Sequence, residues 1–189
     1  SPWNLAEAGL DDGYARTKRQ AEELVLSEVA RGLDAVIVNP GYMFGPYDSR
    51  PSSGKLILDV VRRAVPGYSA GRNSFTDVRD VVDGMLLAAD KGRSGQRYIL
   101  GGHNLGYGQV FERIAAVAGT TPPRLAVPRW IASIPAAFGD LQGSLTGKEP
   151  LLNSNTIAWG YEARFIVSSD KAERELGYAR RPVEEGIAA

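Results

Sequence analysis

Residues 34–39, Asp-Ala-Val-Ile-Val-Asn, form a continuous apolar run in which β-branched side chains predominate. Such a run, bounded here by Gly32 and Pro40, predicts a buried strand of a parallel sheet. A helix is predicted just before it, over residues 12–28, with Asp12 or its neighbour as the cap and Gly32 past the end. A helix that leads through a short turn into a strand is half of a βαβ unit, so an α/β fold is predicted.

The rest of the chain alternates between predicted helices and short strands. Apolar periodicity predicts helices over residues 55–64, 78–91, 107–118, 128–141, 151–159 and 169–176, and a last helix that begins at Pro182. Short β-rich runs predict strands over residues 74–77, 97–100, 125–127 and 165–167. Residues 41–54 are rich in Gly, Pro and Ser, which predicts a long loop, either a substrate loop or lid or a plain surface excursion.

The helix predicted over residues 128–141 carries a clear apolar stripe. Pro128 lies near its start, and Pro135 is expected to kink it. A stripe of this kind favours packing on the core or cover of a domain over a membrane-surface role, because the polar face is not basic. The apolar positions are Trp130, Ile131, Ile134, Phe138 and Leu141.

Several polar residues are predicted to serve the fold rather than the chemistry. Asp77 or Asp80 can cap or charge the N-terminus of the third helix, and Ser168 or Ser169 can cap the helix near the end of the chain. His103 lies in a Gly-rich stretch and is predicted to be a turn residue, because the chain contains no second histidine that would share a metal or base role.

The composition excludes several classes of function. The chain has 189 residues, with 22 Lys plus Arg and 22 Asp plus Glu, and this balance argues against a nucleic-acid-binding protein. The absence of cysteine excludes disulfides, thiol catalysis and Cys–zinc sites, and a single histidine argues against a His-based metal site or a Ser-His-Asp triad. No apolar run reaches membrane-spanning length and no signal peptide is seen, so we predict a cytoplasmic protein without a bound metal.

Tyr14 and Lys18 form the candidate chemical pair. They are four residues apart on the first predicted helix, so they project from one face, one turn apart. A fixed ammonium stabilises a neighbouring phenolate, so the pair can exchange a proton near neutral pH, and the lysine keeps further N–H donors for a sugar hydroxyl. The spacing alone favours a half-buried tyrosine beside a solvated lysine, and only the motifs in the rest of the chain favour the chemical interpretation.

The order of motifs along the chain is more specific than any single one. The segments are YARTKRQAEE (14–23), VIVNPGYMFGP (36–46), FTDVRDVVDGMLLAAD (75–90), GQRYILGGHN (95–104) and SSDKAERELGYARRPVEEGI (168–187). This series resembles the carboxyl-terminal half of an extended short-chain dehydrogenase/reductase. It is most similar to the NAD-dependent epimerase/dehydratase group, with its dihydroflavonol-reductase-like and sugar-epimerase-like members.

The resemblance implies a Rossmann-type fold that binds NAD or NADP. Residues 1–104 would form the carboxyl-terminal part of the Rossmann domain, with a substrate loop over 41–75. Residues 105–189 would form mostly a small α/β substrate-binding subdomain, together with closing helices. Tyr14 would exchange a proton with the substrate oxygen during hydride transfer, and Lys18 would bind the nicotinamide ribose. The nicotinamide pocket would be lined by Pro40, Gly41 and Met43.

The resemblance also bears on the substrate, which would be a carbonyl compound or a sugar. Asn39 and Tyr42 would lie at the mouth of the site, beyond the end of a strand. Sugar-nucleotide epimerases usually place an arginine shortly before the F-x-D segment, where this chain has Asn73, with Arg72 adjacent. An asparagine does not reproduce a charged phosphate contact. A UDP-sugar is therefore disfavoured as the substrate, and a ketone or a smaller sugar is left as a candidate.

The amino-terminal half of such an enzyme has no counterpart in this sequence. No G-x-x-G-x-x-G follows an early strand, so the phosphate-binding turn is expected elsewhere, and this chain is expected to be a fragment that is inactive alone. The family often forms homodimers through a bundle that would include the Tyr14 helix. The alternative functions are a redox-silent dinucleotide-sensing protein of the same fold and, if the chain is complete, a structural module.

Overall fold

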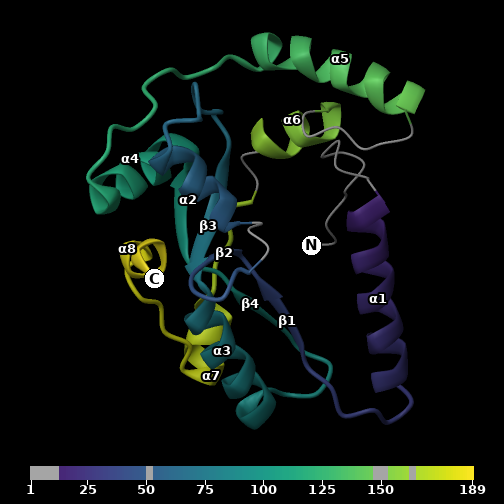
Figure 1. Cartoon of the computed structure of the whole chain (residues 1–189). Coiled ribbons are helices and arrows are strands. Elements are labelled where there is room, and N and C mark those ends of the chain that lie inside the picture. Colours follow the sequence, from purple (N-terminus) through teal and green to yellow (C-terminus); the bar gives the residue numbers. More distant parts are fainter. Residues whose placement is uncertain (1–12, 50–52, 147–152, 162–164) are drawn as a thin grey trace.

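The computed structural model describes residues 13–49, 53–146, 153–161 and 165–189 (Figure 1). The helices are α1 (Gly13–Val29), α2 (Gly54–Val61), α3 (Val78–Lys91), α4 (Tyr107–Ala118), α5 (Arg129–Thr146), α6 (Ser154–Tyr161), α7 (Asp170–Leu176) and α8 (Val183–Ala188). The strands are β1 (Ile37–Pro40), β2 (Tyr42–Phe44), β3 (Arg72–Asp77), β4 (Arg97–Leu100) and β5 (His103–Gly106). The predicted α/β class is confirmed. The predicted first residue of α1, Asp12, and residues 151–152 lie outside the described residues.

The strands form two small sheets. β1 and β4 pair in parallel, with Ile37 opposite Arg97 and Asn39 opposite Ile99. The second sheet has the order β2-β3-β5, in which β2 is parallel and β5 antiparallel to β3. The parallel pairing predicted for the run at 34–39 is therefore confirmed, although the strand itself begins at Ile37.

Four predictions that concern strands were wrong. The predicted loop 41–54 contains β2, because Tyr42 and Phe44 pack their rings against Phe75 of β3, at centroid distances of 5.3 and 5.5 Å. His103 is not a turn residue but the first residue of β5, opposite Phe75. The strands predicted over 125–127 and 165–167 are reduced to single bridges at Ala126 and Phe165.

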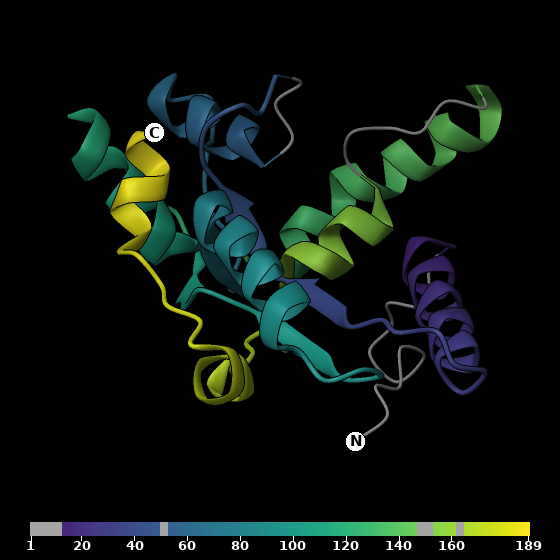
Figure 2. The same cartoon turned by 90° about the horizontal axis from the view of Figure 1, so that it is seen from below.

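Two clusters of buried side chains form the core. The larger lies under β2, β3, α2, α4 and α8, with Phe44, Phe75, Val110 and Ile114 among its fully buried members. The second joins α3, β4 and α7 through Val81, Tyr98, Leu100, Leu176 and Tyr178. In both views α1 and α8 lie at opposite sides of the molecule (Figures 1 and 2). The buried members of both clusters all follow β1 in the chain, although Val36 and Val38 pack against the second cluster.

The predicted burial was too high at two places. The side chains from Val36 to Asn39 are only half-buried, because α1 covers the parallel pair thinly and buries Ala15 alone among its residues. On α5 the buried positions are the small residues Ala136 and Gly139, in a helix that packs on α6 and continues past Pro135. The predicted apolar stripe is exposed at Trp130, Ile131, Ile134, Phe138 and Leu141.

The C-terminal segment closes over the sheets through polar contacts. Ser169 precedes α7, but its hydroxyl does not cap that helix. It accepts a hydrogen bond from the Gly101 amide at 2.9 Å, while Ser168 Oγ accepts from the amide of Asp170 at 3.1 Å. Asp80, buried on α3, accepts the backbone N–H of Arg181 at 2.8 Å and pairs with its guanidinium. Asp80 therefore braces the loop between α7 and α8.

Candidate active site

The structure brings Tyr14 and Lys18 together on the first turns of α1, as their spacing predicts. The Lys18 ammonium nitrogen lies 5.6 Å from the centroid of the Tyr14 ring. Tyr14 is 65% exposed, and Lys18 is exposed beside it. A phenol and an ammonium that share one exposed helix face are available to a ligand, so this arrangement can perform proton transfer.

The first helix is joined to the parallel strands by Glu22. Its carboxylate accepts a hydrogen bond from Asn39 Nδ2 of β1 at 3.4 Å and forms an ion pair with Arg97 at the start of β4. Sequence reasoning missed Glu22, although its position one turn after Lys18 is a signal that could have found it. Tyr14 and Lys18 precede Glu22 on α1, and the amino-terminal end of this helix points toward the same end of the molecule as the carboxyl end of β1 (Figure 1).

Backbone groups crowd together where the strands end. The amide of Gly41 donates to the carbonyl of Leu100 at 3.1 Å, which continues the β1–β4 ladder past Pro40. A Cβ on Gly41 would lie 2.5 Å from the carbonyl oxygen of Ser74, so no larger residue fits there without moving β3. The Ser74 hydroxyl accepts from the amide of Gly102 at 2.9 Å. The backbone is therefore closely packed where β1 and β4 end, and we call this edge of the sheet the rim.

The other predicted cofactor and mouth residues lie along this rim in different environments. Pro40 is exposed at the end of β1, whereas Met43 is half-buried and packs on the cluster around Tyr98. Burial raises the pKa of Tyr42 to about 12, so its phenol stays protonated at neutral pH. The side-chain amide of Asn39 is directed to Glu22. The roles of these residues toward a ligand stay predictions.

Arg72 and Asn73 lie in β3 rather than in a loop. Arg72 is exposed at the start of the strand. The Asn73 side-chain oxygen accepts a hydrogen bond from the amide of Ser74 at 2.8 Å, and the side chain also bonds to the phenol of Tyr107. The Asn73 side chain is therefore already hydrogen-bonded within the protein.

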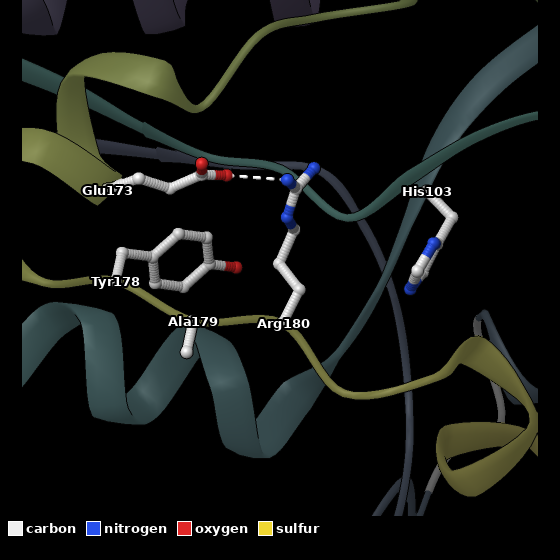
Figure 3. A pocket seen from close by; sticks show the side chains of 5 residues that line it. All are labelled: His103, Glu173, Tyr178, Ala179 and Arg180. Atoms are coloured by element: carbon white, nitrogen blue, oxygen red, sulfur yellow. Dashed lines mark ion pairs between the residues drawn. The ribbon is translucent and has the colours of Figure 1, made fainter.

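A hollow near the C-terminal segment lies apart from Tyr14 and Lys18 (Figure 3). Arg180 pairs with Glu173 at 2.6 Å and donates to the carbonyl of Gly102 at 3.2 Å. Tyr178 donates to the carbonyl of Gly101, and His103 Nε2 lies 2.8 Å from the carbonyl of Arg181. These polar side chains hold the loop after α7 against the sheet, so we assign the hollow a structural role.

Within the described ranges, no group of three or more His, Cys, Asp or Glu side chains is arranged to hold a metal ion. The same part of the chain contains no helix with the length and apolar character needed to cross a bilayer.

Asp77 caps α3, as the sequence predicts. Its buried carboxylate accepts the amide of Arg79 at 2.8 Å and pairs with the guanidinium of the same residue at 2.5 Å. The hydrogen bond from the Arg79 side chain holds the pKa of Asp77 below its ordinary value, although burial opposes the shift. The ionised carboxylate is therefore the form that stabilises the fold.

We expect Asp77→Asn to lower the melting temperature by about 2–5 °C at neutral pH, because the amide keeps the cap but loses the ion pair. A lowered folded-state pKa stabilises the fold above the unfolded value, and this stabilisation is lost as pH falls below about 4. Thermal melts of the two proteins should therefore converge in acid. Asp90→Asn, at an exposed site on the same helix, is the control; a difference that persists in acid would contradict the assignment.

Comparison with known proteins identifies the family. The profile described as the NAD dependent epimerase/dehydratase family matches residues 7–101, half of the chain. The chain belongs to this family. Its cofactor class is a nicotinamide dinucleotide, and more distant solved structures, at 15% and 18% identity, share the fold and hold NADPH or NAD⁺. The predicted Rossmann-type fold and the predicted family are confirmed.

Individual known proteins are similar to nearly the whole chain. Sterol demethylase protein B of Methylococcus capsulatus is 36% identical over 93% of this chain and 54% of its own length. A Synechocystis protein provisionally named dihydroflavonol 4-reductase is 31% identical over 93% of this chain and 52% of its own. The solved structure of gox2253 is 32% identical, with a TM-score of 0.81 over 100% of this chain and 57% of that one. The chain thus spans about half the length of the relatives that it matches.

Proposed function

We propose that this chain supplies the acid/base pair of an NAD(P)-dependent oxidoreductase of the extended short-chain dehydrogenase type, which acts on a carbonyl group. The observation that carries the proposal is the placement of Tyr14 and Lys18. Both are exposed on one face of α1, and the amino-terminal end of this helix points toward the same end of the molecule as the carboxyl end of β1 (Figure 1). Ligands of open α/β sheets bind beyond that edge, so the pair lies where a bound substrate can reach it.

The chemistry follows from the two side chains. The Tyr14 hydroxyl donates its proton to the substrate oxygen during reduction and takes it back during oxidation. The Lys18 ammonium stabilises the phenolate that results and offers its remaining N–H donors to ribose hydroxyls. The nicotinamide, when bound, supplies or accepts the hydride. The residues present fit a nicotinamide nucleotide. Lys18, exposed beside Tyr14, can donate to the ribose, and Pro40 presents apolar surface at the end of β1.

A ketone or another small carbonyl compound fits the site better than a nucleotide sugar. Asn73 carries no charge, and its amide already bonds to Ser74 and Tyr107. A diphosphate would need a charged bidentate partner at this position. The reductase name of one relative supports the same substrate class. In this proposal Asn39 and Tyr42 flank the entrance, and the protonated phenol of Tyr42 can donate to the substrate.

We expect Lys18→Met to weaken NADH or NADPH binding by about tenfold in the enzyme that contains this chain, because the ribose loses a charged donor. Fluorescence titration with each dinucleotide measures the change. Arg19→Met is the control, since Arg19 is the next residue and pairs with Glu23 of its own helix. Equal affinities for the wild type and the Lys18 variant would contradict the ribose role.

Two further expectations accompany this proposal. Dinucleotide binding without turnover of any carbonyl compound would favour the redox-silent sensor of the same fold. The homodimer through α1 also stays a prediction, and light scattering on the purified protein tests it.

A further inference from the structure

We propose that Glu22 is a positioning residue that holds α1 in place on the sheet and so places Tyr14 and Lys18 at the reacting carbonyl. This inference rests on the proposed function of that pair. Glu22 contacts the two parallel strands through Asn39 and Arg97, and its role is to fix the helix that carries the chemistry.

The carboxylate of Glu22 connects three elements. One oxygen accepts from Asn39 Nδ2 of β1 at 3.4 Å, and the other pairs with the guanidinium of Arg97 in β4. The two strands lie side by side, with Arg97 opposite Ile37. A single side chain therefore ties the helix to both strands of the parallel pair.

Apolar packing along the rest of α1 is sparse. Ala15 is the one buried residue of the helix, and Val25, Leu26 and Val29 are only half-buried. Apolar packing of this kind resists separation of the helix from the sheet but resists sliding along it weakly, because it is non-directional. The Glu22 side chain, 26% exposed, supplies directional contacts instead.

The neighbouring Glu23 makes a different kind of contact. It pairs with Arg19 of the same helix at 2.9 Å, and both side chains are more than half exposed. This pair can support helix formation but cannot set the position of α1 against the sheet. Glu23 is therefore a matched control, with the same charge, on the same helix, one residue away.

Glu22 lies a short distance along α1 from Lys18 and Tyr14. At 1.5 Å per residue, Lys18 lies about 6 Å and Tyr14 about 12 Å from Glu22 along the helix axis. A slide or tilt of α1 at Glu22 is therefore passed directly to the phenol. Displacement of a catalytic group by about 1 Å can lower a rate by about a hundredfold.

The test uses kcat and KM of the enzyme that contains this chain, with the dinucleotide that binds tighter and diacetyl as the probe ketone. We expect Glu22→Gln to lower kcat by about 10- to 100-fold while both KM values change by less than about threefold. Glu23→Gln should leave kcat unchanged. The exchanged pair Glu22→Arg with Arg97→Glu should recover most of the lost kcat, because the Asn39 amide can accept as well as donate a hydrogen bond.

A second readout does not depend on activity. Hydrogen exchange of the α1 amides should accelerate in Glu22→Gln and not in Glu23→Gln. Unchanged kcat in Glu22→Gln, alongside a large loss in Tyr14→Phe, would overturn the positioning role and leave the proposed function standing. Unchanged kcat in Tyr14→Phe would instead overturn the proposed function. Failure of the exchanged pair to recover kcat would also count against positioning through this contact.

Discussion

Tyr14→Phe should lower kcat of the enzyme that contains this chain by about a thousandfold. Phenylalanine keeps the ring but has no proton to exchange with the substrate oxygen, and general acid/base catalysis is worth about 10²- to 10⁴-fold. The ring of Tyr14 is 65% exposed, so the substitution should barely change the melting temperature. Initial rates of dinucleotide oxidation with a probe ketone, together with thermal melts, separate the two effects.

Tyr47 provides the matched control for this substitution. It is 98% exposed and belongs to the segment between β2 and α2. Tyr47→Phe removes the same hydroxyl from a different exposed position and should leave kcat within about twofold of the wild type. Similar rates for the wild type and Tyr14→Phe would remove Tyr14 from the chemistry, whatever the control shows.

Gly102→Ala should destabilise the fold severely, by about 3–5 kcal/mol. A Cβ on Gly102 would lie 1.9 Å from the carbonyl oxygen of Phe75 and 2.6 Å from the Cα of Thr76, both backbone atoms of β3. No rotamer change relieves this overlap, so the turn between β4 and β5 must separate from β3. The amide of Gly102 would also leave the hydroxyl of Ser74. Urea unfolding measures the loss.

Gly160→Ala is the control for this prediction. Gly160 lies in α6, and the nearest atom to its Cβ position, Ser69 Oγ, is 4.0 Å away. Alanine should fit there and stabilise the helix by up to about 1 kcal/mol. A Gly102→Ala protein that unfolds at the same urea concentration as the wild type would show that β3 and the β4–β5 turn are not packed as described.

Local patterns predicted the elements whose signals lie within a short stretch. The apolar face and the Asp77 cap predicted α3, and the spacing of Tyr14 and Lys18 predicted their contact on α1. The element between Tyr42 and Phe44 was missed, because Gly and Pro residues surround it and its strand partner, β3, lies far along the chain. His103 was misjudged for the same reason, since β5 exists only through its pairing with β3.

The candidate site was predicted in part. The proximity of Tyr14 and Lys18 follows from helical spacing, but the partners of Asn39 and Asn73 come from other elements and cannot be predicted from local sequence. The exposed stripe on α5 shows the opposite failure. Periodicity identified its apolar residues, such as Trp130 and Phe138, yet a repeat along one helix does not reveal whether another element covers it.

The central claim is that this chain belongs to an enzyme that moves hydride between a nicotinamide and a carbonyl carbon with Tyr14 as the proton partner. Its most direct test supplies NADPH or NADH in which both hydrogens on nicotinamide C4 are replaced by deuterium, with diacetyl as the probe, and analyses the product by mass spectrometry. The account predicts one deuterium on the new carbinol carbon, at a rate about a thousandfold lower in Tyr14→Phe. Product without deuterium, or deuterium transfer at an unchanged rate in Tyr14→Phe, would contradict it.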